Sequence, residues 1–108
     1  MTKRLTPLEK AIVGIVAEHN WPGFHVNQLE VTRRENTGVG RYTYLIDHSG
    51  QSVTDGSYGA GTHFIEMEGV PNGLFFIIEV KNSHVSYIEI VSSGTDSWDG
   101  EERAWRVA

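Results

Sequence analysis

The residues with the clearest potential for acid–base chemistry are three glutamates in the second half of the chain. Glu66 and Glu68 alternate with apolar residues in the run 63–68, so their carboxylates would share one face of a strand. Glu79, in the next expected strand, could join them, and closely spaced carboxylates can serve as general acid and general base. Charges on an exposed strand face also discourage a sheet from pairing with another sheet. We interpret the three glutamates as such a face and predict no catalytic centre.

The histidines lack the spacing that places two imidazoles on one metal ion. Neither a His-x-His nor a His-x-x-x-His pair occurs, and the sequence contains no cysteine that could supply a thiolate ligand, a nucleophile or a disulfide. We therefore predict no metal site and no cofactor. The five histidines are His19, His25, His48, His63 and His84.

Two glycine-containing segments have the composition of ligand-binding loops but not the required pattern. If Gly100 is aligned with the invariant glycine of a calcium loop, Arg106 falls where a bidentate glutamate is needed. The glycines of segment 56–61 are not followed by the Lys-Ser/Thr pair of a phosphate-binding loop, and a strand rather than a helix is expected next. No Gly-x-Ser-x-Gly motif occurs. The sequence therefore indicates a protein that is not an enzyme.

One helix is predicted near the N-terminus. Thr6 has the character of an N-cap, Pro7 suits the first helical position, and Glu9 would complete a capping box. The run 21–23, Trp-Pro-Gly, ends the helix because the residue before a proline disfavours helical geometry. Glu9 lies outside the apolar stripe of this helix. The stripe itself consists of Leu8, Ile12, Ile15 and Val16, widened by Ala11 and Val13.

The rest of the chain has the short β-branched and aromatic runs of antiparallel strands. No linker or repeat interrupts it, so we predict one α+β domain over residues 1–108, with the helix packed on an antiparallel β-meander of five to six strands. A short closing strand is also expected around residues 105–107. The other expected strands cover residues 28–35, 41–47, 51–54 (short), 63–68, 74–81 and 85–92.

The hairpin formed by residues 74–92 raises a question about what covers the sheet. A two-residue loop at Asn82 and Ser83 would place Ile78 opposite Tyr87, and this register makes both faces of the hairpin apolar. One helix covers only one face of a sheet. We expect the second face to be covered by the C-terminal segment with Trp98 and Trp105, by a second protomer or by a partner protein.

The net charge of −5 is unevenly distributed along the chain. Residues 1–41 carry six cations and four anions, whereas residues 42–108 carry three cations and ten anions. Nucleic-acid binding depends on cations that neutralise phosphates, so we predict no nucleic-acid ligand. The longest apolar run, residues 74–78, is far shorter than the roughly 20 residues needed to cross a bilayer. We predict no membrane association and a cytoplasmic location.

The acidic surface with aromatic residues leads to the main functional hypothesis, a module that binds a basic protein. Tryptophan often dominates binding energy at interfaces, and carboxylates speed encounter with a basic partner. In its small size and acidic charge the chain resembles small bacterial immunity proteins, which implies an inhibitor that covers a basic site. Trp98 could instead fold inward. The candidate partner-binding residues are Asp96, Trp98, Asp99, Glu101 and Glu102.

Two further hypotheses remain open from the sequence. The first is a small-ligand binder or enzyme with a pocket between the sheet and the 56–61 connection, lined by Tyr58, His63 and Glu66. The second is a homodimer joined through the second face of the 74–92 hairpin.

Overall fold

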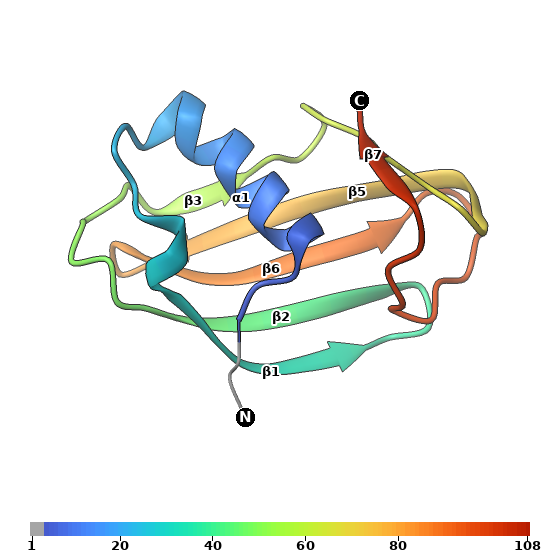
Figure 1. Ribbon diagram of the computed structural model, residues 1–108, viewed down its shortest axis with the longest axis horizontal. Helices are drawn as coiled ribbons and strands as arrows, with labels where there is room; N and C mark the ends of the chain where they lie inside the picture. The colour runs from blue at the N-terminus through green and yellow to red at the C-terminus, as the bar shows by residue number, and fades with distance from the viewer. Residues whose placement is uncertain (1–3) are drawn as a thin grey trace.

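A single helix lies across one face of a seven-stranded antiparallel sheet in the computed structural model, which describes residues 4–108 (Figure 1). The predicted α+β class, with an N-terminal helix on an antiparallel sheet, is confirmed. No helix in this described part combines the length and the apolar character needed to cross a bilayer. The elements are α1 (Pro7–Asn20), the short 3₁₀ helix η1 (Val26–Gln28), β1 (Leu29–Asn36), β2 (Gly40–Asp47), β3 (Gly56–Tyr58), β4 (Ile65–Met67), β5 (Val70–Lys81), β6 (His84–Ser92) and β7 (Trp105–Val107).

Helix α1 begins with the predicted capping box. The Thr6 hydroxyl accepts a hydrogen bond from the Glu9 backbone N–H at 3.1 Å, and the Glu9 carboxylate accepts one from the Thr6 backbone N–H at 2.9 Å. Although Glu9 lies outside the predicted apolar stripe, its side chain is fully buried against cations on the sheet. The apolar residues that α1 buries are Leu8, Ile12, Val13, Val16 and Ala17.

The strands do not follow one another as a simple meander. Their order is β1-β2-β6-β5-β4-β7, with β3 also pairing to β5. Residues 4–108 therefore form three hairpins, β1–β2, β4–β5 and β5–β6, and the β2–β6 contact joins the first of them to the other two. The expected strand at residues 51–54 is wrong, since that stretch is irregular and the third strand is β3 instead. The closing strand is confirmed as β7, which pairs with β4.

A β-bulge changes the register that the sequence suggests for the β5–β6 hairpin. The two-residue loop is confirmed, since Asn82 and Ser83 both adopt positive φ angles of 53° and 67°, as the hairpin turns that match strand twist require. Beyond Val80 the pairing shifts by one residue, so that Ile78 faces Ile88 rather than Tyr87. Such a shift turns every later side chain of one strand to the opposite face.

The bulge determines which side chains of β6 lie on the buried inner face of the sheet and which lie on the outer face. Phe76, Ile78, Ile88 and Ile90 all point inward and are fully buried beneath α1. The outer face, which we define as the side of the sheet opposite α1, receives the intervening side chains. The predicted apolar second face is therefore only partly correct, because β6 contributes its tyrosine and glutamate to it rather than its isoleucines.

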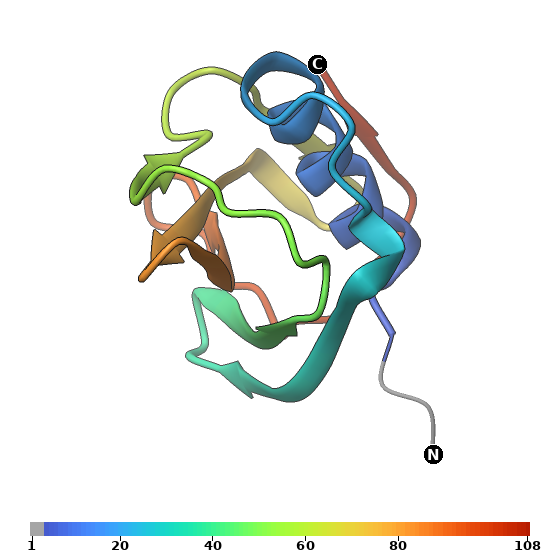
Figure 2. The same ribbon diagram turned by 90° about the vertical axis from the view of Figure 1, so that its left-hand side faces the viewer.

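The C-terminal segment does not cover the outer face. Trp98 is only 2% exposed and belongs to the buried core, and Trp105 packs against the same core. Figure 2 shows α1 and the C-terminal strand on the same side of the curved sheet. Of the three expected covers, the Trp-bearing tail is excluded within residues 4–108, and a second copy or a partner protein remains.

Candidate functional site

Most side chains of the 96–102 loop, which was predicted to bind a partner, form contacts with other residues of the same chain. Asp96 accepts hydrogen bonds from the backbone N–H and side-chain amide of Asn72, at 2.7 and 3.1 Å. Trp98 is folded inward, and its indole N–H donates to the Glu101 backbone carbonyl at 2.9 Å. The loop is thus fastened to the sheet by the residues that were expected to contact a partner.

The other carboxylates of the loop differ in their exposure and in whether they form an ion pair. Asp99 forms an ion pair with Arg103 at 2.7 Å, and this hydrogen bond, helped by the Glu101 backbone N–H, lowers the pKa of Asp99 to about 2. Glu102 accepts hydrogen bonds from the Arg41 guanidinium and the Thr6 hydroxyl at 2.7 and 2.6 Å. Glu101 stays exposed. Of these three carboxylates, Asp99 and Glu102 are already paired with arginines, and Glu101 is exposed.

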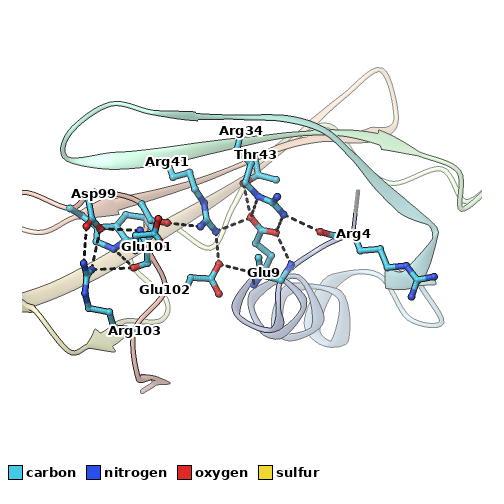
Figure 3. Close-up of polar contacts among 12 residues, drawn as sticks. Arg4, Glu9, Arg34, Arg41, Thr43, Asp99, Glu101, Glu102 and Arg103 are labelled. Carbon is cyan, nitrogen blue, oxygen red and sulfur yellow. Dashed lines mark hydrogen bonds and ion pairs between the residues drawn. The ribbon is translucent and has the colours of Figure 1, made fainter. Parts of the chain in front are cut away.

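The inner face holds a buried ion-pair network centred on Glu9 (Figure 3). Arg34 approaches the Glu9 carboxylate with two nitrogens, at 2.7 and 3.1 Å, and Arg41 donates at 2.8 Å. The Thr43 hydroxyl donates at 2.7 Å, and the Thr6 backbone N–H completes the set. Burial raises the pKa of Glu9, but the Arg34, Thr43 and Thr6 hydrogen bonds and the Arg41 charge outweigh it and lower the pKa.

The geometry of this network fits a structural role rather than a catalytic one. Both Glu9 oxygens are filled by donors from the same chain, and the Glu9 side chain has no exposed surface. Arg41 also binds Glu102, so the network joins α1, β1, β2 and the C-terminal loop. Sequence reasoning missed it. Two features of the sequence could have revealed it: the capping glutamate of α1 and the cations at inward positions of two strands.

The 56–61 connection, beneath which a pocket was predicted, packs against the sheet at Gly59. Gly59 has a φ of 97°, and a Cβ built there would lie 2.4 Å from the Phe76 ring, so the connection lies directly against the sheet. Tyr58 packs edge-on against the Trp21 ring at 5.0 Å between centroids. The space that a ligand would need is therefore occupied at this point.

The two other residues of that predicted pocket lie in separate contacts. The His63 ring stacks on the His19 ring, with centroids 6.3 Å apart. Glu66 accepts a hydrogen bond from Arg106 at 2.5 Å across the β4–β7 pair and remains largely exposed. The structure does not assemble Tyr58, His63 and Glu66 into one site. Within residues 4–108, no group of three or more acidic or histidine side chains is placed to hold a metal ion.

The outer face carries a feature that the sequence analysis did not identify, a cluster of three tyrosines from two neighbouring strands. Tyr42 and Tyr44 of β2 stack at 6.0 Å between centroids with an interplanar angle of 17°. Tyr87 of β6 lies edge-on to Tyr42 at 5.7 Å and tilted against Tyr44 at 6.1 Å. We call Tyr42, Tyr44 and Tyr87 the tyrosine cluster. The regular β2–β6 pairing places Tyr87 directly opposite Tyr44.

No family model, curated protein or solved structure matches the chain. Two regions of the molecule have a distinctive arrangement of polar or aromatic side chains, the Glu9 network on the inner face and the tyrosine cluster on the outer face.

Glutamates border the tyrosine cluster on both sides. The pairing register places Glu35 and Glu89 on either side of Tyr42, and Glu79 opposite Tyr87. Burial raises the pKa of Tyr87, and the charges of Glu79 and Glu89 raise it further. The cluster is thus an aromatic surface in a negative field, and no helix or terminal segment of the described chain covers it.

Proposed function

We propose that this chain is a non-enzymatic protein-binding module whose contact surface is the outer face of the sheet. The observation that carries the proposal is the uncovered tyrosine cluster. Tyrosine is enriched among the residues that dominate binding energy, because it offers a large rigid ring and a polar hydroxyl at a low cost in conformational entropy. This moves the expected contact surface from the 96–102 loop to strands β2, β5 and β6.

The shape of the outer face supports a protein partner more than a small ligand. Small-molecule sites are concave and enclose most of the ligand surface. The tyrosine cluster instead lies on the open outer face of the sheet. The apolar residues Phe75 and Ile46 on this face are also exposed, by 38% and 46%. A surface of this kind, with aromatic residues inside a polar border, is typical of an interface between proteins.

The charge of the face supports a basic partner, as expected of an inhibitor that covers a cationic site. Carboxylates around an aromatic centre accelerate encounter with a positively charged protein and disfavour wrong partners. A cysteine-free chain also suits a reducing compartment, and we propose that the complex forms in the cytoplasm.

A second copy of the chain is the less favoured occupant. Around the cluster each outer face carries Glu35, Glu79 and Glu89 against two cations, Arg33 and Lys81. Placing two such faces together would bring a net negative charge from each copy into one interface, and like charges weaken association. The chain is expected to sediment as a monomer at micromolar concentration. A dimer at that concentration, lost when Tyr87 is changed to serine, would favour the homodimer instead.

Affinity capture with three baits tests the proposal. The baits are the natural chain, Tyr42→Ser/Tyr87→Ser on the outer face, and the matched control Glu18→Gln/Glu101→Gln, which changes two exposed residues elsewhere. We expect the natural chain and the control to retain the same protein from the native host at low salt, and the tyrosine variant to lose it. Equal recovery by all three baits would count against the outer face as the contact surface.

A further inference from the structure

The tyrosine cluster already binds cations from its own chain. The Arg33 guanidinium lies 4.0 Å from the centre of the Tyr44 ring, and the Lys81 ammonium lies 5.5 Å from the centre of the Tyr87 ring. Both distances are within the roughly 6 Å over which an aromatic face attracts a cation. Two of the three rings are therefore shown to accept the two basic side-chain types in this structure.

The internal cations are held weakly enough to yield to a partner. Arg33 is 60% exposed, and its ion pair with Glu35 is long, at 3.9 Å. Exposed pairs of this kind contribute little to stability because solvent screens them. Lys81 is exposed as well. Neither side chain belongs to the buried network, so both can move aside without disturbing the core.

The negative charge around the rings adds a second attraction for cations. The Tyr44 hydroxyl donates to Glu35 at 3.3 Å, and a hydrogen bond with Glu89 is the main cause of a raised pKa at Tyr42. On β5, opposite Tyr87, the Glu79 carboxylate accepts a hydrogen bond from the Ser57 hydroxyl at 2.5 Å. By the pairing register, the outward charged residues near the cluster are mainly glutamates.

We propose that the tyrosine cluster and its bordering glutamates receive the arginine and lysine side chains of an extended basic segment in the partner protein. The inference rests on the proposed function and specifies its chemistry. Guanidinium and ammonium groups would stack on the ring faces, and the carboxylates of Glu35, Glu79 and Glu89 would accept their N–H donors. The partner segment would displace Arg33 and Lys81 from the rings.

Other occupants fit the surface less well. A nucleic acid would bring phosphates against the glutamates, and a second copy would bring a matching set of carboxylates. A free polyamine shares the cationic chemistry but has no side chains to reach several rings at defined spacing. The polypeptide is therefore the occupant to which the charge and the spread of the rings point.

A direct test uses an eleven-residue peptide of alternating arginine and serine, with the citrulline–serine peptide as an uncharged control of the same shape. Nitrogen–proton NMR spectra of the natural chain should shift at the outer residues of β1, β2, β5 and β6 when the arginine peptide is added, and not with citrulline. Tyr42→Ser/Tyr87→Ser should weaken binding on the order of tenfold, whereas Tyr42→Phe/Tyr87→Phe, which keeps the rings, should retain most of it.

Matched charge variants distinguish binding at a defined site from attraction to the net negative charge of the chain. Glu79→Gln/Glu89→Gln should weaken peptide binding several-fold more than Glu18→Gln/Glu101→Gln, although both remove two negative charges. Lys81→Gln, which frees the Tyr87 ring, should strengthen binding more than Lys10→Gln. Urea unfolding of each variant verifies that it is folded.

Three results would overturn the inference. The first is equal weakening by both glutamate pairs, the second is binding unaffected by the serine variant, and the third is spermidine shifting the same residues as strongly as the peptide. If the peptide fails while capture of the host protein still depends on Tyr42 and Tyr87, only the basic-segment inference is lost. If capture also fails, the proposed function is lost with it.

Discussion

Strand β2 shows the contrast between the two faces of this sheet within a few residues. Arg41 and Thr43 point inward and bind the buried Glu9 carboxylate at 2.8 and 2.7 Å. Tyr42 and Tyr44, the alternate residues, point outward and stack on each other in contact with solvent. Successive side chains of a strand lie on opposite faces, so one short segment serves both regions.

The two regions differ in how much of their binding chemistry remains accessible to another molecule. The Glu9 carboxylate is enclosed by donors of the same chain, and removing one member of such a pair would leave an unpaired charge in the core. The tyrosine cluster keeps its ring faces near solvent and holds its own cations loosely. An enclosed carboxylate can only stabilise the fold, whereas exposed ring faces can still bind another molecule.

The largest expected effect is the loss of Glu9. Glu9→Ala leaves Arg34 and Arg41 without their shared buried carboxylate, and breaking a buried pair in this way costs about 3–5 kcal/mol. Urea unfolding should show this loss, while Glu18→Ala on the exposed side of α1 should change stability by less than about 0.5 kcal/mol. Similar values for the two variants would contradict a structural role of the network.

The next effect compares two successive residues of β6. Ile88 points inward and has no exposed surface, so Ile88→Ala should cost about 2–5 kcal/mol in unfolding free energy through the cavity it leaves. Tyr87 points outward, and Tyr87→Ala should cost only about 1 kcal/mol, mainly from lost ring contacts. Comparable losses would mean that the outer face is held as tightly as the core.

A smaller effect concerns pH. The folded protein lowers the pKa of Glu9 from its usual 4.5, so the unfolded chain takes up this proton first. The stability that the ionised carboxylate contributes is present above pH 4.5 and is lost as the pH falls through the lower, folded pKa. Glu9→Gln should therefore unfold with a flatter acid dependence than the natural chain. Parallel curves of the urea midpoint between pH 2 and 7 would oppose this assignment.

The smallest effect is expected in the acidic loop. Asp99 is exposed, and its pKa of about 2 arises first from the hydrogen bond with Arg103. Arg103→Ala should return the Asp99 titration toward the usual 3.8, measured by carbon NMR of the carboxyl group, with little change in thermal stability. An unchanged midpoint would show that the ion pair does not persist in solution.

The sequence contained enough information to predict the class of the fold and several local features. The capping box at Thr6 and the turn at Asn82 and Ser83 depend only on neighbouring residues, and both are confirmed. The closing strand at Trp105 was also evident from its alternation. Local hydrogen bonds and φ preferences act over a few residues, so a single sequence is sufficient to find them.

The candidate sites depended on long-range contacts that the sequence does not specify. Glu9 lies outside the apolar stripe of its helix, yet its carboxylate is buried against cations that are 25 and 32 residues away in the sequence. The one-residue bulge in β6 exchanged Tyr87 and Ile88 between the faces, so the tyrosine cluster could not be found from the regular register. Both features follow from pairing between distant strands.

NMR mapping of the bound partner, the protein recovered by affinity capture, tests the central claim most directly. Unlabelled partner added to the nitrogen-labelled chain should shift and broaden the amide signals around Tyr42, Tyr44 and Tyr87, and leave those of residues 96–102 unchanged. Shifts confined to residues 96–102, with the signals of the tyrosine cluster unmoved, would contradict the account and return the contact surface to the acidic loop.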